Sequence, residues 1–550
     1  MNSLQRLSEA DAIQRLAAHD GSLYTSDIDV RQKITHRLGW TDLAEKAPQR
    51  IPLIVTLGKT LVEEGATDIV LLGMGGSSLA ALVMSQIIGS APGMPRLHVL
   101  DTTNPLVIDR ALHTLDRAST YFLISSKSGT TIEPLSLYAI FRAWMEEKFP
   151  RPQAGKHFIA ITDPGSALEK LRTRDLMRLT LNTPPSVGGR FSALTLFGLT
   201  PAALIGIDVA EMCSRAQEME RRCHADTPDN PGAVLAAFLG DAHAAGRDKL
   251  TLVTCDDLRP FGLWVEQLVA ESTGKEGTGL VPVIEHDATT PPDFGPDRVV
   301  VVMRHRHDDA LRRWAGMLAD KHPVIELELD DPLDIGAEFV RWEHAIALLG
   351  LLMGINPFDE PNVAEAKAAT TSMLTGDLSA PQAIADHNGI WTTFSGSLAD
   401  SPPPAELTAT ASTILESLQP GDYLATLAYL PEEGELMAHL RTALKRVSSA
   451  MKIATCLETG PRYLHSTGQL HKGGPTNGVF LVITARERGD IEIPGHSFTL
   501  NRLFRAQAEG DIHTLAAHGL RVARLDLPAA DARSVASVAA ALVAAARFQA

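Results

Sequence analysis

Short hydroxyl side chains gather after an apolar run in residues 123–134, which read LISSKSGTTIEP. This pattern is typical of a buried strand, a tight loop and the N-terminus of a helix. Free backbone N–H groups, the positive end of a helix dipole and hydroxyl donors are groups that bind phosphate. The same residues would also suit a simple Ser/Thr helix cap beside a flexible turn. The candidate phosphate ligands are Ser126, Lys127, Ser128 and Thr131.

A glycine-rich loop at residues 73–78, GMGGSS, offers Gly75, Gly76 and Ser77 to the same ligand. It is not a dinucleotide fingerprint, because that motif would need glycine where Ser78 stands. Taken alone, such a loop is most often a tight turn. Two strand–loop–helix units favour a binding site, since in a doubly wound sheet both loops gather at the carboxyl edge. We therefore expect them to hold one phosphate and the near end of its sugar.

Two further stretches could supply a cation and a base. In residues 185–192, PSVGGRFS, Gly189 lets the backbone approach a ligand while Arg190 faces a phosphate or a developing oxyanion. In residues 264–275, WVEQLVAESTGK, Glu271 stands at the end of a helical pattern, where a carboxylate could enter a cleft as a general base. From spacing alone, an ordinary surface arginine and a surface glutamate are the alternatives.

Lysine and histidine side chains complete the set of candidates. Lys367 follows the turns of INPFDEP on a new helix, and His465 and His471 lie six residues apart in a loop-rich stretch. Metal binding would need a third ligand at suitable spacing, which is not found there, so no metal site is expected. A proton shuttle near neutral pH suits imidazole better. A solvated lysine and a solvated loop are the plainer alternatives.

Strands and helices alternate between residues 68 and 329, which predicts parallel sheets covered by helices. Trp40 and Leu43 are the expected anchors of the segment before them. A linker-like stretch ends in three prolines at 402–404, and the strands beyond it are expected to complete the second sheet. The predicted parts are an N-terminal helical segment (1–50), a first, phosphate-binding α/β domain (51–205), a second α/β domain (206–374), a linker or insertion (375–422) and a C-terminal α/β segment completing the second domain (423–550).

Composition excludes several function classes. The 550-residue chain is 45% hydrophobic and 21% charged, as expected of a globular protein with large cores. A net charge of −16 argues against nucleic acids and anionic membranes as main partners. Four cysteines without a C-x-x-C pair indicate reduced thiols and a cytoplasmic location. Neither a signal-peptide core nor an apolar run long enough to span a bilayer is found.

Six sequence blocks together resemble those of the phosphoglucose isomerases, and five of them stand in the usual order. The closest likeness is to the isomerase part of transaldolase–glucose-6-phosphate isomerase fusion proteins, although no segment suggests the transaldolase barrel. The resemblance implies an α/β fold with two doubly wound, parallel-sheet sugar-isomerase (SIS-type) domains, the second completed by an inserted or permuted C-terminal segment. The blocks are GMGGSS, SSKSGTT, GGRFS, AESTGK, INPFDEPNVAEAK and LHSTGQLHKGG.

The resemblance also implies a role for individual residues. Gly189 and Arg190 would face the sugar, with Arg190 steadying an enediolate. Glu271 matches the glutamate that carries a proton between C1 and C2, and Lys367 matches a lysine that helps to open the ring. The implied phosphate cradle consists of Ser77, Ser126, Lys127, Ser128 and Thr131.

Two departures from the family pattern concern the site. Glu360 stands where the family usually has glutamine, so a substrate contact there needs testing. The catalytic histidine usually falls between the glutamate and the lysine, where this chain has His286 in a poor motif match. The better match is His465, which follows Lys367 and is the expected catalytic histidine.

The reaction that the resemblance implies is isomerisation of glucose 6-phosphate to fructose 6-phosphate in glycolysis and gluconeogenesis, without a cofactor. An isomerase that also accepts mannose 6-phosphate is one alternative. A sugar-phosphate-binding regulator is another, and it would need the hydroxyl loops but not Glu271, Lys367 or His465. Family members are commonly homodimers that share a histidine between subunits, whereas His465 could serve its own chain.

Overall fold

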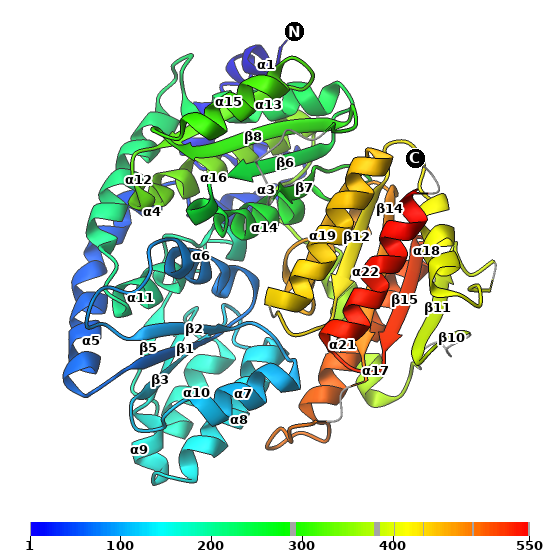
Figure 1. The fold of residues 1–550 in the computed structure, drawn as a ribbon. Helices are drawn as coiled ribbons and strands as arrows, with labels where there is room; N and C mark the ends of the chain where they lie inside the picture. The colour runs from blue at the N-terminus through cyan, green and yellow to red at the C-terminus, as the bar shows by residue number, and fades with distance from the viewer. Residues whose placement is uncertain are drawn as a thin grey trace.

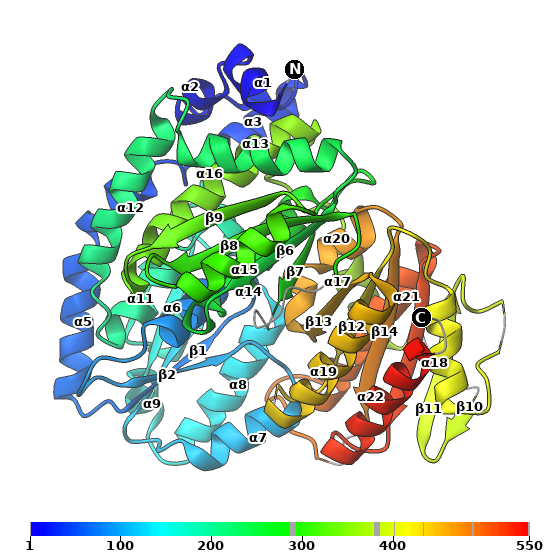
Figure 2. The same cartoon turned by 45° about the horizontal axis from the view of Figure 1, so that its top comes forward.

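The strands of the chain form three sheets in a computed structural model that describes residues 2–285, 293–378, 385–400, 402–432, 434–486 and 489–547. In Figure 1 the first sheet lies at the lower left, the second at the top and the third on the right; Figure 2 turns the same view. Helices cover each sheet, so the predicted α/β class with parallel sheets is confirmed. In the described part of the chain, no helix is both long and apolar enough to cross a membrane.

The first sheet is entirely parallel, with the strand order β2-β1-β3-β4-β5. All strands run the same way, but the chain adds β2 on one side of β1 and β3 to β5 on the other, so the strand order reverses between β1 and β3. Ligands of open α/β sheets bind at such a reversal point. Its strands are β1 (Asp68–Leu72), β2 (Arg96–Leu100), β3 (Thr120–Ser125), β4 (Phe158–Thr162) and β5 (Leu179–Asn182). Its helices are α5 (Ile51–Glu63), α6 (Leu79–Ile87), α7 (Pro105–Thr114), α8 (Ile132–Glu146), α9 (Arg151–Gly155), α10 (Ala167–Asp175) and α11 (Leu196–Leu204).

Both faces of β1 are buried, which explains its unbroken apolar sequence. Ile69 and Leu71 join a core that includes α6 and α11, whereas Val70 and Leu72 join a separate core with α8. The two loops after β1 and β3 are thereby fixed from both sides.

The second sheet is also parallel, with the order β7-β6-β8-β9, and it reverses between β6 and β8. β7 was not predicted from the sequence. The strands are β6 (Lys249–Thr254), β7 (Val281–Glu285), β8 (Arg298–His305) and β9 (Val324–Leu329). The helices are α12 (Val209–His224), α13 (Pro231–Ala244), α14 (Phe261–Thr273), α15 (Asp309–Ala319) and α16 (Ile335–Met353).

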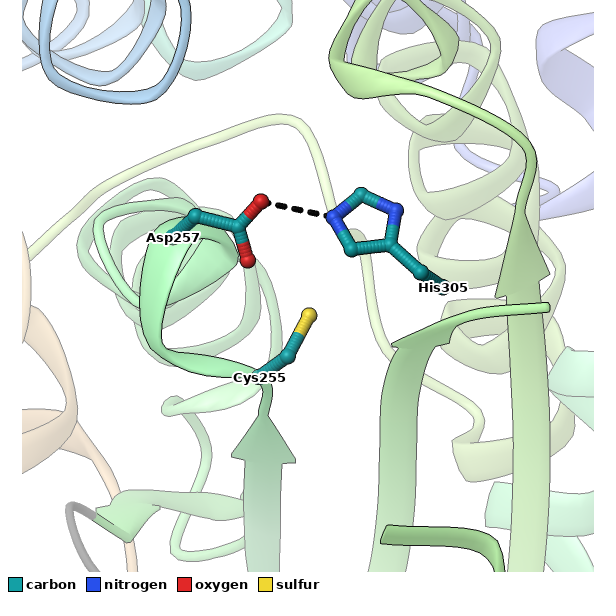
Figure 3. Close-up of side chains that lie close together, drawn as sticks. All are labelled: Cys255, Asp257 and His305. Atoms are coloured by element: carbon teal, nitrogen blue, oxygen red, sulfur yellow. Dashed lines mark hydrogen bonds and ion pairs between the residues drawn. The ribbon is translucent and has the colours of Figure 1, made fainter. Parts of the chain in front are cut away.

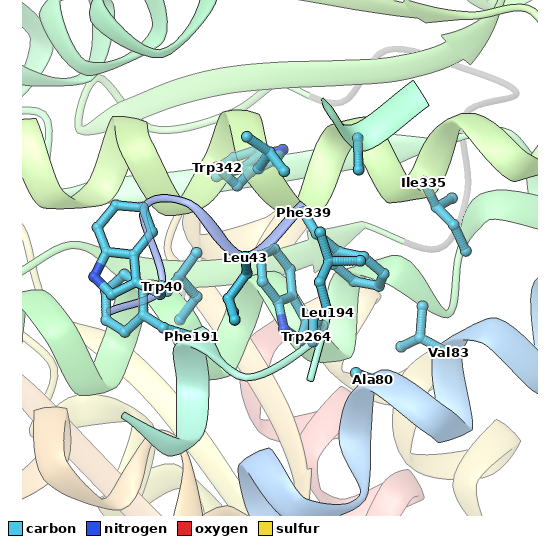
Figure 4. Packing of buried hydrophobic residues seen from close by; sticks show 14 of the residues in the cluster. Trp40, Leu43, Ala80, Val83, Phe191, Leu194, Trp264, Ile335, Phe339 and Trp342 are labelled. Atoms are coloured by element: carbon cyan, nitrogen blue, oxygen red, sulfur yellow. The ribbon is translucent and has the colours of Figure 1, made fainter. Parts of the chain in front are cut away.

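The N-terminal segment packs into the core between the first two sheets. Trp40 and Leu43, the expected anchors, are both buried, and the Trp40 ring stacks on Phe191 with centroids 4.9 Å apart. Figure 4 shows these residues in one cluster with Trp264 of α14 and Trp342 of α16. The segment contains α1 (Ser3–Glu9), α2 (Ala12–Ala17), α3 (Ile28–Arg37) and α4 (Leu43–Lys46).

The C-terminal strands do not complete the second sheet as expected. They form a third sheet, of order β10-β11-β15-β14-β12-β13. β12 to β15 pair in parallel, whereas β11 pairs antiparallel with both β15 and β10. The stretch predicted as a linker or insertion contributes β10, β11 and α18; the predicted domain boundaries stay a prediction. The strands are β10 (Ala385–His387), β11 (Ile390–Gly396), β12 (Tyr423–Ala428), β13 (Ala454–Thr459), β14 (Gly478–Ala485) and β15 (Arg521–Leu527). The helices are α17 (Val363–Thr375), α18 (Leu407–Glu416), α19 (Gly434–Met451), α20 (Gly468–Gly473), α21 (Leu500–Ala517) and α22 (Ala532–Arg547).

A proline explains why the second and third sheets stay separate although the edge strands β7 and β13 are in contact. The Val281 N–H donates to Asp248 on the β6 side, so the next residue, Pro282, directs its backbone toward β13. Proline has no N–H to donate to a ladder. The Pro282 carbonyl accepts only the Cys456 thiol, at 3.5 Å, among the described contacts.

Candidate active site

The loops after β1 and β3 meet at the reversal point of the first sheet. Ser125 Oγ donates to the Ser77 carbonyl at 2.7 Å and so ties the two loops together. Within the second loop, Ser126 Oγ donates to Thr131 Oγ1 at 3.2 Å and accepts the Gly129 N–H at 3.2 Å. Ser128 is exposed, and Ser77 and Thr131 are partly exposed. The predicted phosphate residues therefore do lie together at one accessible place.

Lys127 differs from a free phosphate ligand, because its ammonium group is an ion-pair partner of Asp163. It also lies 3.4 Å from the carbonyls of Pro184 and Pro185, at the start of the loop that leads to Arg190. Burial lowers the pKa of Lys127, and Asp163 opposes that effect. The lysine thus links the loop after β3 to the arginine loop.

Two glycines permit the close approach of the loop after β1 to the arginine loop. A Cβ atom on Gly76 would lie 2.1 Å from the Gly189 carbonyl oxygen, which no side chain could tolerate. Ser192 Oγ, 3.0 Å from the Gly76 carbonyl, joins the same two loops. Gly75 is equally confined, since its Cβ would meet the His465 carbonyl at 2.8 Å. Glycine at these positions is a requirement of backbone packing.

Arg190 is buried and held through all of its side-chain nitrogens. Nε donates to Ser272 Oγ at 2.8 Å, and Nη2 donates to the carbonyls of Pro357 at 2.8 Å and Asp359 at 2.9 Å. Nη1 lies 3.2 Å from Glu271 Oε1 and 3.1 Å from Glu360 Oε2. The guanidinium is therefore fixed in place before any substrate arrives.

Glu271, in the last turn of α14, has a side chain only 12% exposed. Burial raises its pKa, and Arg190 opposes this while Glu360 adds to it. Its Oε2 atom accepts Gln267 Nε2 at 3.2 Å. A buried carboxylate with a raised pKa beside a fixed cation is suited to take up and return a proton.

Glu360 has the opposite electrostatic balance. Burial raises its pKa, but the nearby charges of Arg190 and Arg37 outweigh burial and leave the pKa below its ordinary value. The charged Glu360 thus shares Arg190 with Glu271. A glutamine at this position could not compete for the guanidinium in the same way.

His465 reaches the same region from the turn after β13 of the third sheet. Its Nε2 atom lies 2.8 Å from Glu133 Oε1, and Gln267 Nε2 donates to its carbonyl at 2.8 Å. Burial raises the pKa of Glu133, but His465, a backbone hydrogen bond and Lys367 together outweigh this effect and leave the pKa lowered. Gln507 of α21 donates to the same Glu133 oxygen at 2.7 Å. An orienting carboxylate therefore fixes the imidazole.

The remaining candidates lie at the margin or beyond the structure. Lys367 is exposed on α17, where its charge helps to lower the pKa of the buried Glu133. His471 lies apart from the site, buried with its Nε2 atom 3.3 Å from Glu458 Oε1. His286 lies outside the described residues.

Sequence reasoning missed the residues that support the chemistry. Glu133 lies inside the LISSKSGTTIEP motif and is buried in the first turn of α8. The available signal was an acidic residue in the first turn of the expected helix. Gln267 precedes Glu271 by one helical turn, so the helical period could have suggested that they meet. Ser272 adjoins Glu271 in the sequence, but its hydrogen bond with Arg190 was not predicted. Nothing in the sequence pointed to Gln507.

Parallel sheets covered by helices, with serine-rich loops where the strand order changes direction, place the chain in the class of α/β proteins. Among solved structures, a protein of Thermus thermophilus described as hypothetical superposes with a TM-score of 0.60 at 23% identity, over 68% of this chain and 96% of that one. A glucose-6-phosphate isomerase from Chlamydia trachomatis has a TM-score of 0.50 at 18% identity, over 68% of this chain and 84% of that one. These two likenesses concern the fold.

Sequence comparison relates part of the chain to a known family. Residues 55–296 match the phosphoglucose isomerase family. A glucose-6-phosphate isomerase of Rubrobacter xylanophilus is 28% identical over 56% of this chain and 83% of its own length. Another, of Carboxydothermus hydrogenoformans, is 27% identical over 67% of this chain and 91% of its own length. Residues 55–296, which include the loops after β1 and β3, Arg190 and Glu271, thus have the sequence pattern of the phosphoglucose isomerases.

Proposed function

We propose that the chain is an aldose–ketose isomerase that interconverts glucose 6-phosphate and fructose 6-phosphate through a cis-enediolate. The observation that carries this proposal is the buried ion pair of Glu271 and Arg190, 3.2 Å apart, beside the serine-rich loops. It supplies a base and a cation at one place, and an anion site adjoins it. The proposal also agrees with the names of the relatives that match the chain.

The phosphate group anchors the substrate on the loops after β1 and β3. Backbone N–H groups and the hydroxyls of Ser77, Ser126 and Thr131 are the proposed donors. Because the phosphate is remote from C1 and C2, its binding energy serves to orient the reacting end of the sugar.

Proton transfer between C1 and C2 is assigned to Glu271. Its carboxylate removes the C2 proton of the open-chain aldose, and the electron pair moves into the C1–C2 bond and onto the carbonyl oxygen O1. The proton of the O2 hydroxyl is transferred to O1, and returning the carbon-bound proton to C1 then yields the ketose. Arg190 stabilises the negative charge on the enediolate oxygen. Its guanidinium is already held in place, so no reorganisation is needed during the reaction.

Ring opening is assigned to His465, with Lys367 assisting from α17. One group must remove the proton of the anomeric hydroxyl while a proton is delivered to the ring oxygen. The carboxylate of Glu133 orients the imidazole of His465 for this transfer. The chain is further proposed to act in the cytoplasm, which rests on its cysteine usage.

A coupled assay tests the function directly. The full chain is incubated with fructose 6-phosphate without added metal, and glucose 6-phosphate is followed by its oxidation with a dehydrogenase. We expect saturable conversion in both directions. Binding of fructose 6-phosphate without any turnover would contradict the proposal and indicate a regulator.

A further inference from the structure

The second sheet also reverses direction, between β6 and β8, and the loops that leave these two strands carry three potential metal ligands. Cys255 directly follows β6, Asp257 lies in the short turn after it, and His305 is the last residue of β8 (Figure 3). The Cys255 N–H donates to the Met303 carbonyl at 3.2 Å, so parallel pairing sets the ends of the two strands side by side. Residues far apart in the sequence are thereby brought together.

The three side chains offer their donor atoms toward one point. One ligand atom from each lies within 4.8 Å of the others, and His305 Nε2 is 2.6 Å from Asp257 Oδ2. In the part of the chain that the structure describes, this is the one group of three such residues. The side chain of His305 is 27% exposed and that of Asp257 is 48% exposed, so solvent reaches the group from one side.

The sulfur of Cys255 is available as a ligand, because it belongs to a free, partly buried thiol close to the Asp257 carboxylate and the His305 imidazole. A bound cation would displace the thiol proton and use all three groups.

We propose that Cys255, Asp257 and His305 form a zinc site with three protein ligands and one position open to solvent. Thiolate, imidazole and carboxylate are the ligands that Zn²⁺ accepts in tetrahedral geometry. Magnesium and calcium prefer sites made wholly of oxygen ligands, which a cysteine and a histidine exclude. Binding exchanges the thiol proton, which is released to buffer, for the metal.

The zinc site is separate from the proposed isomerase site. The turn of Cys255 and Asp257 precedes α14, whose last turn carries Glu271. A helix of 13 residues is about 20 Å long, so no zinc ligand reaches the sugar. The ion would join the turn before α14 to the end of β8 and so fix the start of the helix that positions Glu271.

Metal titration of the full chain tests the zinc site. Cobalt(II) serves as the spectroscopic probe, and zinc is then used to displace it. We expect one equivalent of Co²⁺ to give a sulfur-to-cobalt charge-transfer band and the intense visible bands of four-coordinate cobalt. Cys255→Ser should abolish the charge-transfer band. Asp257→Asn and His305→Gln should each weaken zinc binding at least about 10- to 100-fold, the loss seen even for outer-shell partners.

Matched controls stand next to the ligands. Asp256→Asn and His307→Gln replace exposed neighbours of the same residue types, and both should bind zinc as the unchanged chain does. A second measurement needs no variant: one equivalent of zinc should protect Cys255 of the unchanged chain from alkylation, as read by mass spectrometry of its peptide. Alkylation of Cys255 at the same rate with and without zinc would overturn the proposal, as would a cobalt spectrum without the sulfur band.

Discussion

Arg190 serves two carboxylates whose pKa values shift in opposite directions. The pKa of Glu271 is raised by its burial, whereas that of Glu360 is lowered because Arg190 and Arg37 outweigh its burial. At neutral pH, Glu360 therefore keeps its charge and draws on the same guanidinium as the proposed base. The charge of Glu360 thus becomes a way of tuning Glu271.

Replacing Glu360 by glutamine should change the pH dependence of the isomerase. The negative charge of Glu360 raises the pKa of Glu271, so its removal lowers that pKa and leaves Arg190 to Glu271. Because the base must be deprotonated, the acid limb of the kcat/KM profile should move to lower pH. The check is the pH–rate profile of Glu360→Gln beside that of Glu365→Gln, an exposed carboxylate on α17. An acid limb that stays in place or moves to higher pH would contradict the tuning.

The elements of the site are loops whose backbones touch. The glycine-rich turn after β1 lies so close to the arginine loop that a Cβ on Gly76 would come within 2.1 Å of the Gly189 oxygen. Phosphate binding and the position of Arg190 therefore depend on one backbone contact between two loops.

Gly76→Ala should separate these loops. We expect a loss of about 1–3 kcal/mol in the free energy of unfolding, typical of overpacking, together with a higher KM for fructose 6-phosphate. The matched control is Gly316→Ala in α15, where no atom lies within 4 Å of the new Cβ. That change should be neutral or stabilise the helix by up to about 1 kcal/mol. Denaturant unfolding and steady-state kinetics give both readings, and an unchanged KM in Gly76→Ala would refute the role of the contact.

Periodicity predicted most elements near the site because their strands are apolar on both faces and end in polar loops. β1, β3 and β6 were expected close to where they lie. β7 was missed, because Pro282 and a loop-rich setting hide a short edge strand. β11 was missed since it lies in a proline- and serine-rich stretch that looks like a linker.

The candidate site was less predictable than its loops. Arg190 and Glu271 were assigned from motifs, but their ion pair joins the loop after β5 of the first sheet to helix α14 beside the second sheet, and it could not be read from spacing. Cys255 and His305 illustrate the same limit, since only the pairing of β6 with β8 brings them together. Motifs find residues that act locally, and strand order decides which of them meet.

At the scale of the whole molecule, one chain brings together side chains from helices and loops that belong to all three sheets. Glu133 comes from the first unit, Glu271 from α14 over the second, and His465 from the loop after β13 of the third. The C-terminal sheet is thus an integral part of the proposed site. A catalytic histidine from a neighbouring subunit is not required by this arrangement.

A mixing experiment tests assembly within one chain. The His465→Gln and Glu271→Gln variants each lack one group of the proposed mechanism, so both should be inactive, and mixing them after dissociation should leave the mixture inactive. If subunits shared the site, half of the random dimers would be mixed and each would hold one intact site of two, giving about a quarter of the normal activity. Recovery of that activity would show that the histidine acts across subunits.

The most direct test of the central claim is the turnover of fructose 6-phosphate by Glu271→Gln. Loss of the base should lower kcat about 10²- to 10⁴-fold, the usual contribution of general base catalysis. Binding of a hexitol 6-phosphate, which cannot isomerise, should change by less than about threefold, under about 1 kcal/mol, because the phosphate loops are intact. A Glu271→Gln variant with near-normal kcat would contradict the assignment of the base and with it the proposed mechanism.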